Sequence, residues 1–188
     1  MAPNQDEHHL VAHYVSCFAL VHTGRLVLRR VRLEDGAAMF AVHGDPATNL
    51  HNPSGPDPDR ATSDEALRVW LQDWECEGYG YWAITLSSSE NILGFGGVRR
   101  IMWRGRDVLN LYYRLTPSAW GQGYASEMAQ EAVMLARRHM PSLPVIARTR
   151  TNNVASIRVA ERAGLQRRPD LDTEHVVFAS GWTFVDGA

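Results

Sequence analysis

The stretch from Leu115 to Ser126 carries residues whose types and spacing suit the binding of a large anion. It joins a predicted strand to a predicted helix and contains Gly121 and Gly123. The first N–H groups of a helix have no partner within it, and that end carries about half a positive charge. Glycine lets the backbone bend and lets an anion approach without interference from a Cβ. We therefore expect a pyrophosphate cradle, built from the backbone amides of Gln122, Gly123, Tyr124, Ala125 and Ser126.

Other readings of this glycine pattern are weaker. A Gly-x-Gly turn before a helix can also be a simple tight turn. No Gly-Lys-Ser/Thr run follows, so the pattern is not a Walker phosphate loop. A dinucleotide-binding motif is matched in part, with Ser126 at its third small position, but no ribose-binding acid follows at the required distance. The pattern therefore disfavours a nicotinamide-dependent oxidoreductase.

A second polar cluster, from Thr149 to Ser156, joins the next predicted strand to a short helix. Asparagine and serine at a helix start are more often caps than ligand contacts. Here Asn153 and Ser156 follow the cradle by one strand, and in a splayed sheet both helix starts face one cleft. We therefore expect one helix start to hold a diphosphate and the other to hold the arm of the same cofactor, with capping as the alternative.

The composition excludes several classes of function. The chain has 188 residues, which suits a single domain. All 19 of its Lys+Arg residues are arginine, so a lysine Schiff base and a Walker lysine are excluded. A net charge of −2 and a pI near 6.4 give no reason to expect a nucleic-acid partner. The cysteines Cys17 and Cys76 fit a reducing compartment, and we interpret His8, His9 and His13 as a solvated polar segment, so no metal is expected.

The beginning of the chain shows neither a membrane span nor a secretion signal. The apolar stretch Val11 to Val21 is interrupted by polar residues and falls short of the roughly 20 apolar residues that a span needs. Asp6 and Glu7 stand where a signal peptide has a basic cluster. We expect a cytoplasmic protein with no membrane partner, and we expect residues 1–7 to be disordered.

The hydrophobic pattern predicts a single α+β domain with a mixed sheet, in the order β-α-α-β-β-β-α-β-α-β. Strands are expected at residues 25–31, 81–86, 92–100, 108–115, 145–147 and 175–179. The second helix is expected to begin at a capping box of Thr62 and Glu65 and to stop at Gly78. The glycines of the strand at 92–100 indicate a bulge or the close approach of another backbone or of a ligand. The proline-rich loop 47–60 is typical of a substrate lid.

Three runs of residues, in order along the chain, resemble the signatures of the GNAT superfamily of N-acetyltransferases. Tyr113 to Glu127 reads Y-R-L-T-P-S-A-W-G-Q-G-Y-A-S-E and is similar to the acyl-CoA motif. Asn153 to Leu165 reads N-V-A-S-I-R-V-A-E-R-A-G-L, and the opening reads R-L-V-L-R-R-V-R-L-E-D-G-A-A-M-F. Both resemble the branch of the ribosomal-protein alanine acetyltransferases (RimJ/RimL type). The resemblance covers residues 24–182 and leaves 1–23 as a partly disordered extension and 183–188 as a tail.

The resemblance implies a mixed, mostly antiparallel sheet flanked by helices and splayed between strands four and five. Acetyl-CoA would be the cosubstrate, without a metal. Its pantetheine arm would pair with the backbone from Tyr113 to Leu115, and its pyrophosphate would lie on residues 121–126. Asn153 would hold the arm, and Ser156 would lie near the thioester sulfur. The acetyl group would pass directly to a primary amine, of a protein N-terminus or a small molecule.

Three positions depart from the wider pattern of the superfamily. Trp120 stands where many members have Gln or Arg. Ala160 stands where many carry a tyrosine that protonates the leaving thiolate, and Asn110 stands where many carry a carboxylate. The alternative function is therefore a non-catalytic acyl-CoA-binding or sensor module on the same fold.

The candidates for catalysis are few. Ser156 would stabilise the thiolate, with an ordinary helix-start hydroxyl as the alternative. Glu174, at the entry to the last strand, is our candidate base; its neighbour His175, and Glu77 and His51 near the acceptor loops, are others. Each of these is also typical of a solvated surface, and a water chain is a further route for the proton.

The acceptor side is open to several readings. Tyr112, Trp82 and Trp103 could wall an acceptor pocket, with core packing as the alternative. Four loop carboxylates could favour a cationic acceptor or simply solubilise the loop: Asp45, Asp57, Asp59 and Asp64. The partner is an amine acceptor, and because dimers are common among such enzymes, a homodimer is one arrangement that the resemblance allows.

Overall fold

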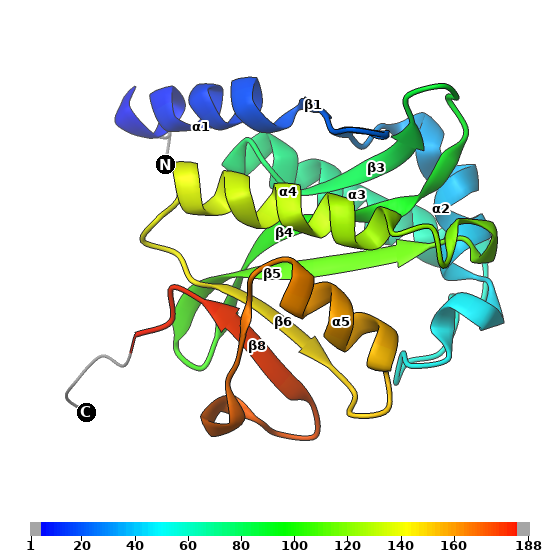
Figure 1. Ribbon diagram of the computed structural model, residues 1–188. Coiled ribbons are helices and arrows are strands. Elements are labelled where there is room, and N and C mark those ends of the chain that lie inside the picture. Colours follow the sequence, from blue (N-terminus) through cyan, green and yellow to red (C-terminus); the bar gives the residue numbers. More distant parts are fainter. Residues whose placement is uncertain (1–4, 184–188) are drawn as a thin grey trace.

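The computed structural model describes residues 5–183 and shows one sheet with helices on both faces (Figure 1). The helices are α1 (Gln5–Phe18), α2 (Gly36–His43), α3 (Arg60–Glu77), α4 (Tyr124–His139) and α5 (Val154–Arg162). The strands are β1 (Leu20–His22), β2 (Leu26–Arg30), β3 (Tyr81–Leu86), β4 (Ile92–Trp103), β5 (Arg106–Leu115), β6 (Val145–Thr149), β7 (Gln166–Arg167) and β8 (Val176–Ser180). The predicted α+β class is confirmed.

The sheet has eight strands in the order β1-β2-β3-β4-β5-β6-β8-β7, and every neighbouring pair is antiparallel except β5 and β6. These two parallel strands pair at two positions, Leu109 with Val145 and Asn110 with Ile146. Beyond Asn110 they diverge, and Figure 1 shows their arrowheads pointing apart. The expected splay between the fourth and fifth predicted strands is therefore present, as the opening between β5 and β6.

The two faces of the sheet are covered by different helices. Helix α4 packs on β2, β4 and β5 and against α5, whereas α2 packs on β4 and β5 and against α3. Gly96 in β4 shows why the glycines of this strand are needed: a Cβ there would lie 2.8 Å from the backbone oxygen of Tyr112 in β5 and 2.7 Å from Cε of Met128 in α4. A register shift between Ile84 and Thr85 also marks a bulge in the pairing of β3 with β4. Both expectations for this strand, a bulge and a close approach, are met.

Helix α3 begins earlier than the sequence analysis predicted. Its N-cap is Asp59, whose side chain accepts hydrogen bonds from the backbone N–H and the hydroxyl of Thr62. The predicted cap at Thr62 is therefore wrong, because the proline-rich loop places a better acceptor three residues before it. The helix ends as predicted at Gly78, which adopts a left-handed conformation with φ of +76°.

The beginning of the chain differs from the expectation of disorder. Residues 5–18 form α1, which includes part of the segment expected to be disordered; residues 1–4 lie outside the described residues, as do 184–188 of the expected tail. The fully buried Phe18 ends α1 and stacks on Trp82 of β3, with ring centroids 6.1 Å apart. The helix is therefore held by contacts with residues distant in sequence. Across residues 5–183, no helix is both long enough and apolar enough to cross a bilayer.

Candidate active site

The opening begins at two consecutive tyrosines of β5. Side chains alternate between the faces of a strand, so Tyr112 lies on the face of α2 and α3, and Tyr113 on the face of α4 and α5. The hydrogen-bonding directions of the backbone alternate as well. Leu109 N donates to Pro144 O on the β6 side, so the amides of Tyr113 and Leu115 also point toward β6. Where β6 has turned away, these amides face the opening, as a strand-like ligand would need.

The expected cradle lies at the start of α4. Gly121 and Gly123 both have positive φ, of +74° and +80°, and a Cβ built on Gly121 would have nothing within 4 Å. No side chain caps the helix at Gly123. The first N–H groups of α4 have no intrahelical acceptor, and they follow directly at Tyr124, Ala125 and Ser126. The turn therefore offers unpaired donors and free space, which is what a pyrophosphate requires.

A clamp that the sequence analysis missed holds this turn in place. Arg25 donates from Nη1 to the carbonyl oxygen of Gln122 over 2.9 Å, and its guanidinium lies 4.8 Å from the ring centre of Tyr124. The same arginine pairs with Glu127 at 2.7 Å. Burial acts to raise the pKa of Glu127, but hydrogen bonds from Thr23 and Arg25 outweigh it and hold that pKa low. Glu127 thus remains ionised and ties the start of β2 to the first turn of α4.

Trp120 closes the end of β5. Its Nε1 donates to the carbonyl oxygen of Leu115 over 2.9 Å, while 46% of the residue stays exposed. Of the backbone predicted to pair with a ligand, the Leu115 carbonyl is therefore already engaged. Trp120 is part of the wall of the cradle, and it supplies no cation there.

At the start of α5, Asn153 caps the helix and also keeps a free donor for a ligand, so it fits both of the alternatives given for it. Asn153 is the N-cap, and its Oδ1 accepts a hydrogen bond from Ser156 N over 3.1 Å. Its Nδ2 remains as a donor for another group. Burial raises the pKa of Tyr113 to about 12, and the Ser156 hydroxyl, which faces this phenol, opposes that effect. The Tyr113 oxygen itself is buried without a well-formed hydrogen bond. The structure thus brings Ser156, predicted to lie near the thioester sulfur, beside Tyr113, predicted to pair with the pantetheine arm.

On the opposite face, His43 of α2 contacts Tyr112. Its Nδ1 lies 3.1 Å from the carbonyl oxygen of Met39, and its Nε2 lies 2.7 Å from the Tyr112 hydroxyl. A carbonyl can only accept, so Nδ1 carries the proton, and Nε2 accepts from the tyrosine. Burial lowers the pKa of His43 from 6.5 to about 4, and the cation of Arg114 acts in the same direction. His43 is therefore neutral at neutral pH, with a fixed tautomer.

An aromatic wall surrounds this pair. Trp70 and Tyr81 pack on Tyr112 with ring centroids 5.9 and 4.9 Å away. Of the three wall residues expected, Tyr112 is the one found here. Trp82 is fully buried and donates to Phe18 O, so it belongs to the core. Trp103 pairs with the first residue of β5, at the far end of the hairpin, and packs on Trp182.

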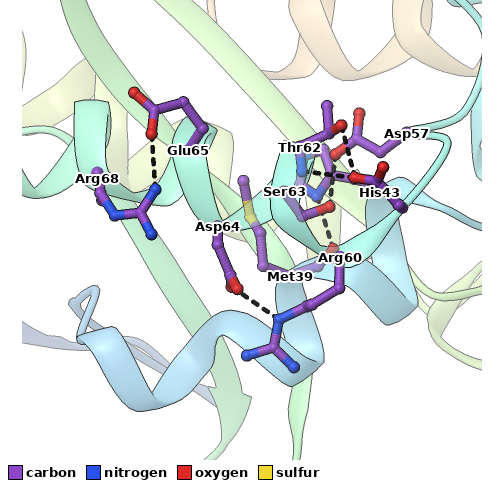
Figure 2. A network of polar contacts seen from close by, with 10 residues as sticks. Met39, His43, Asp57, Arg60, Thr62, Ser63, Asp64, Glu65 and Arg68 are labelled. Carbon is purple, nitrogen blue, oxygen red and sulfur yellow. Dashed lines mark hydrogen bonds and ion pairs between the residues drawn. The ribbon is translucent and has the colours of Figure 1, made fainter.

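The four loop carboxylates divide into two groups. Asp45 accepts from Ala47 N, Asp59 caps α3, and Asp64 pairs with Arg60 at 2.7 Å. These three have structural partners. Asp57 accepts from the Ser63 hydroxyl over 2.5 Å and forms no ion pair within residues 5–183. Its backbone N–H donates to the carbonyl oxygen of His43, and Figure 2 shows the two residues together at the start of α3.

The surface candidates for a base have ordinary surroundings. The side chain of Glu174 is 81% exposed and lies 3.6 Å from Nδ1 of His175. Glu77 pairs with Arg100 at 3.6 Å, and His51 is exposed. Glu174 stays a prediction, and none of these contacts sets it apart as a base. His43 and Arg25 carried no sequence signal, because each acquires its role from a partner far along the chain.

Comparison with known proteins agrees with this geometry. Residues 25–166 match the family described as acetyltransferase (GNAT) domain. The chain belongs to the GNAT acetyltransferase family. The expected cradle, the open edge of β5 and the start of α5 all lie within the matched range.

Individual GNAT relatives share between 16% and 33% sequence identity with this chain. The FsC-acetyl coenzyme A-N(2)-transacetylase of Aspergillus fumigatus is 33% identical over 106 residues, which cover 56% of this chain and 41% of the length of that protein. An acetyltransferase from Agrobacterium tumefaciens has the same fold, with a TM-score of 0.74 and 24% identity over 86% of this chain and 93% of its own. A RimL ribosomal alpha-N-protein acetyltransferase in complex with coenzyme A has a TM-score of 0.68 and 16% identity, covering 86% and 97%. The RimJ/RimL branch therefore stays a prediction.

Proposed function

We propose that the chain is an acetyl-CoA-dependent N-acetyltransferase that acts on a primary amine. The observation that carries this proposal is the pairing of the uncapped start of α4 with an open edge of β5. The pyrophosphate would lie on the amides of residues 121–126, and the pantetheine arm would pair with the backbone of Tyr113 and Leu115. The Asn153 Nδ2 would donate to the arm.

The two tyrosines would then serve the two sides of the reaction. The amine nitrogen attacks the thioester carbonyl carbon, a C–N bond forms, the C–S bond breaks, and the amine proton is lost. A β5 amide facing the opening would polarise the carbonyl oxygen. Tyr113 and Ser156, whose hydroxyls face one another, would donate to the departing thiolate. Tyr113 of β5 would thus supply the phenol that many family members place on the helix, at the position of Ala160 in this chain.

On the acceptor side, Tyr112 would orient the amine. Its proton is committed to His43 Nε2, so its oxygen presents lone pairs to an N–H of the incoming amine. His43, with a pKa of about 4, is a weak base, and its role is to hold the tyrosine proton. We assign His43 as a positioning residue, and we assign the final acceptance of the proton to water or to the carboxylate of Asp57.

The acceptor is proposed to be cationic before it reacts. Asp57 acts electrostatically on both His43 and Tyr112 and lacks an arginine partner within the described range. A free carboxylate beside an aromatic wall suits an ammonium group. The name of the fungal relative indicates acetyl transfer at a nitrogen, and that of the RimL structure indicates a protein alpha-amino group. The test therefore includes both small-molecule amines and peptide N-termini.

The test is acetyl transfer measured by thiol release from acetyl-CoA, against a panel of polyamines, aminoglycosides and peptides with free N-termini. We expect turnover with at least one amine, and mass spectrometry should show the acetyl group on the nitrogen. Tight binding of acetyl-CoA without turnover on any amine would favour the alternative, a non-catalytic acyl-CoA sensor. In that case acetyl-CoA would still raise the melting temperature, but no amine would be acetylated.

A further inference from the structure

A cluster of nitrogen and sulfur ligands lies far from the opening, where α1 crosses the end of α4. Nε2 of His13 lies 3.0 Å from Nδ1 of His139, and Sγ of Cys17 lies 3.9 Å from the same Nε2. All three atoms lie within 4.8 Å of one another. His13 and Cys17 are one helical turn apart on α1, and His139 is the last residue of α4. From the sequence we interpret His13 as part of a solvated polar segment, whereas the fold places Cys17 and His139 beside it.

The spacing of these atoms is close to that of a tetrahedral metal site. Zinc binds nitrogen at about 2.0–2.1 Å and thiolate sulfur at about 2.3 Å, so tetrahedral angles place two nitrogens about 3.3 Å apart and a nitrogen and a sulfur about 3.6 Å apart. The observed 3.0 and 3.9 Å each differ from these values by a few tenths of an ångström. The third pair, Nδ1 of His139 and Sγ of Cys17, lies within 4.8 Å, so these two atoms must approach by up to about 1.2 Å for all three donors to reach one ion.

The surroundings hold the imidazoles in position. The two rings face each other nitrogen to nitrogen, so one proton at most lies between them. The His139 ring also packs on the buried Phe18, with centroids 6.0 Å apart, which fixes its position. An ion between the rings would replace a shared proton.

We propose that His13, Cys17 and His139 bind a Zn²⁺ ion, with water in the fourth position. Two imidazoles and one thiolate form a donor set that suits this borderline-soft ion. Binding would release the thiol proton of Cys17 and would fasten α1 to the C-terminal end of α4. The cradle begins at the other end of α4, about 22 Å away at 1.5 Å per residue. The ion is therefore separate from acetyl transfer.

Cobalt(II) is the probe for this site, because a thiolate bound to it gives a strong near-ultraviolet charge-transfer absorption. The full chain, kept reduced by a phosphine, is titrated with Co²⁺ and then with Zn²⁺. We expect one Co²⁺ per chain with this absorption, displaced by Zn²⁺, and a rise in the melting temperature with Zn²⁺. Cys17→Ser should abolish the absorption, and His139→Gln should weaken Co²⁺ binding at least tenfold. Cys76→Ser, at the exposed second cysteine, is the matched control and should bind like the wild type.

Three results would overturn the proposal. They are the lack of a thiolate absorption in the wild type, its retention in Cys17→Ser or loss in Cys76→Ser, and unchanged affinity in His139→Gln. The melting-temperature shift with acetyl-CoA should be the same in every variant. That shift shows that each variant is folded, and it separates failure of the metal site from failure of the proposed acetyltransferase.

Discussion

The Tyr112 hydroxyl donates to Nε2 of His43 over 2.7 Å, at the point where β5 parts from β6. This contact commits the phenolic proton to His43 and leaves the oxygen lone pairs for another donor. The next residue, Tyr113, faces the opposite side of the sheet beside Ser156. In the proposed reaction, the two neighbouring tyrosines separate the acceptor side from the leaving-group side.

Replacing Tyr112 with phenylalanine should lower kcat/KM for the amine about tenfold, the worth of one hydrogen bond to the acceptor. Acetyl-CoA binding should not change, because the phenol lies on the other face. Steady-state kinetics and calorimetric titration measure the two quantities. Tyr79→Phe removes another buried phenol, next to α1, and should leave both unchanged. An unaltered kcat/KM in Tyr112→Phe would refute the orienting role.

Tyr113 and Ser156 should act as one unit. Tyr113→Phe and Ser156→Ala should each lower kcat, and the double variant should be no slower than the slower single variant. Residues in contact couple by about 1 kcal/mol. A double-mutant cycle on kcat measures this coupling. Losses that simply add would show that the two hydroxyls act independently, and that Ser156 is an ordinary residue of the helix start.

The neutral His43 should make the protein sensitive to acid. Its pKa is about 4 in the folded chain because of burial, against 6.5 for an ordinary histidine. Between these values the unfolded chain binds a proton that the folded chain does not. The free energy of unfolding contributed by this residue is therefore complete above pH 6.5 and falls by up to about 3 kcal/mol toward pH 4.

Urea unfolding of the wild type and His43→Gln between pH 7 and pH 4 tests this dependence. The difference in unfolding free energy between the two proteins should shrink as the pH falls. His139 titrates equally in both proteins and cancels. A difference that is constant over this range would mean that His43 has the same pKa in the folded protein as in the unfolded chain.

Arg25→Ala should weaken acetyl-CoA binding about five- to tenfold, because the turn loses its hold on the Gln122 carbonyl and the Glu127 charge beside the anion is no longer balanced. Calorimetric titration gives the dissociation constant. Arg68→Ala is the control, since this arginine pairs with Glu65 on the exposed surface of α3. Equal affinity in Arg25→Ala and Arg68→Ala would show that the clamp does not support the cradle.

The glycine turn before α4 could be predicted from the sequence because its signals are local. Gly121, Gly123 and the helix that follows lie within a few residues, and backbone conformation there depends on the residue type itself. The same holds for the cap at Asn153 and the stop at Gly78. Short elements such as β1 and β7 could not be predicted, because two or three residues carry no periodic pattern and exist through pairing with β2 and β8.

The rest of the candidate site depends on contacts between residues far apart in the chain. His43 and Tyr112 are 69 residues apart, and Arg25 and Glu127 are 102 apart. Sequence patterns relate residues a few positions apart, so neither pair could be found from the sequence. The four loop aspartates could not be told apart from the sequence either. Asp45 and Asp59 accept hydrogen bonds from backbone N–H groups, Asp64 pairs with an arginine, and Asp57 accepts from a serine hydroxyl; the fold determines these partners.

The most direct test of the account is the shift in melting temperature with acetyl-CoA in Gly123→Glu and in Gly105→Glu. Both glycines have positive φ, of +80° and +74°, and Gly105 lies in the β4–β5 turn with nothing near its Cβ position. Both variants should lose about 1 kcal/mol of stability from the backbone. We predict that Gly105→Glu keeps the full acetyl-CoA shift and that Gly123→Glu loses it, because a carboxylate enters the cradle. An undiminished shift in folded Gly123→Glu would contradict the assignment of the cradle.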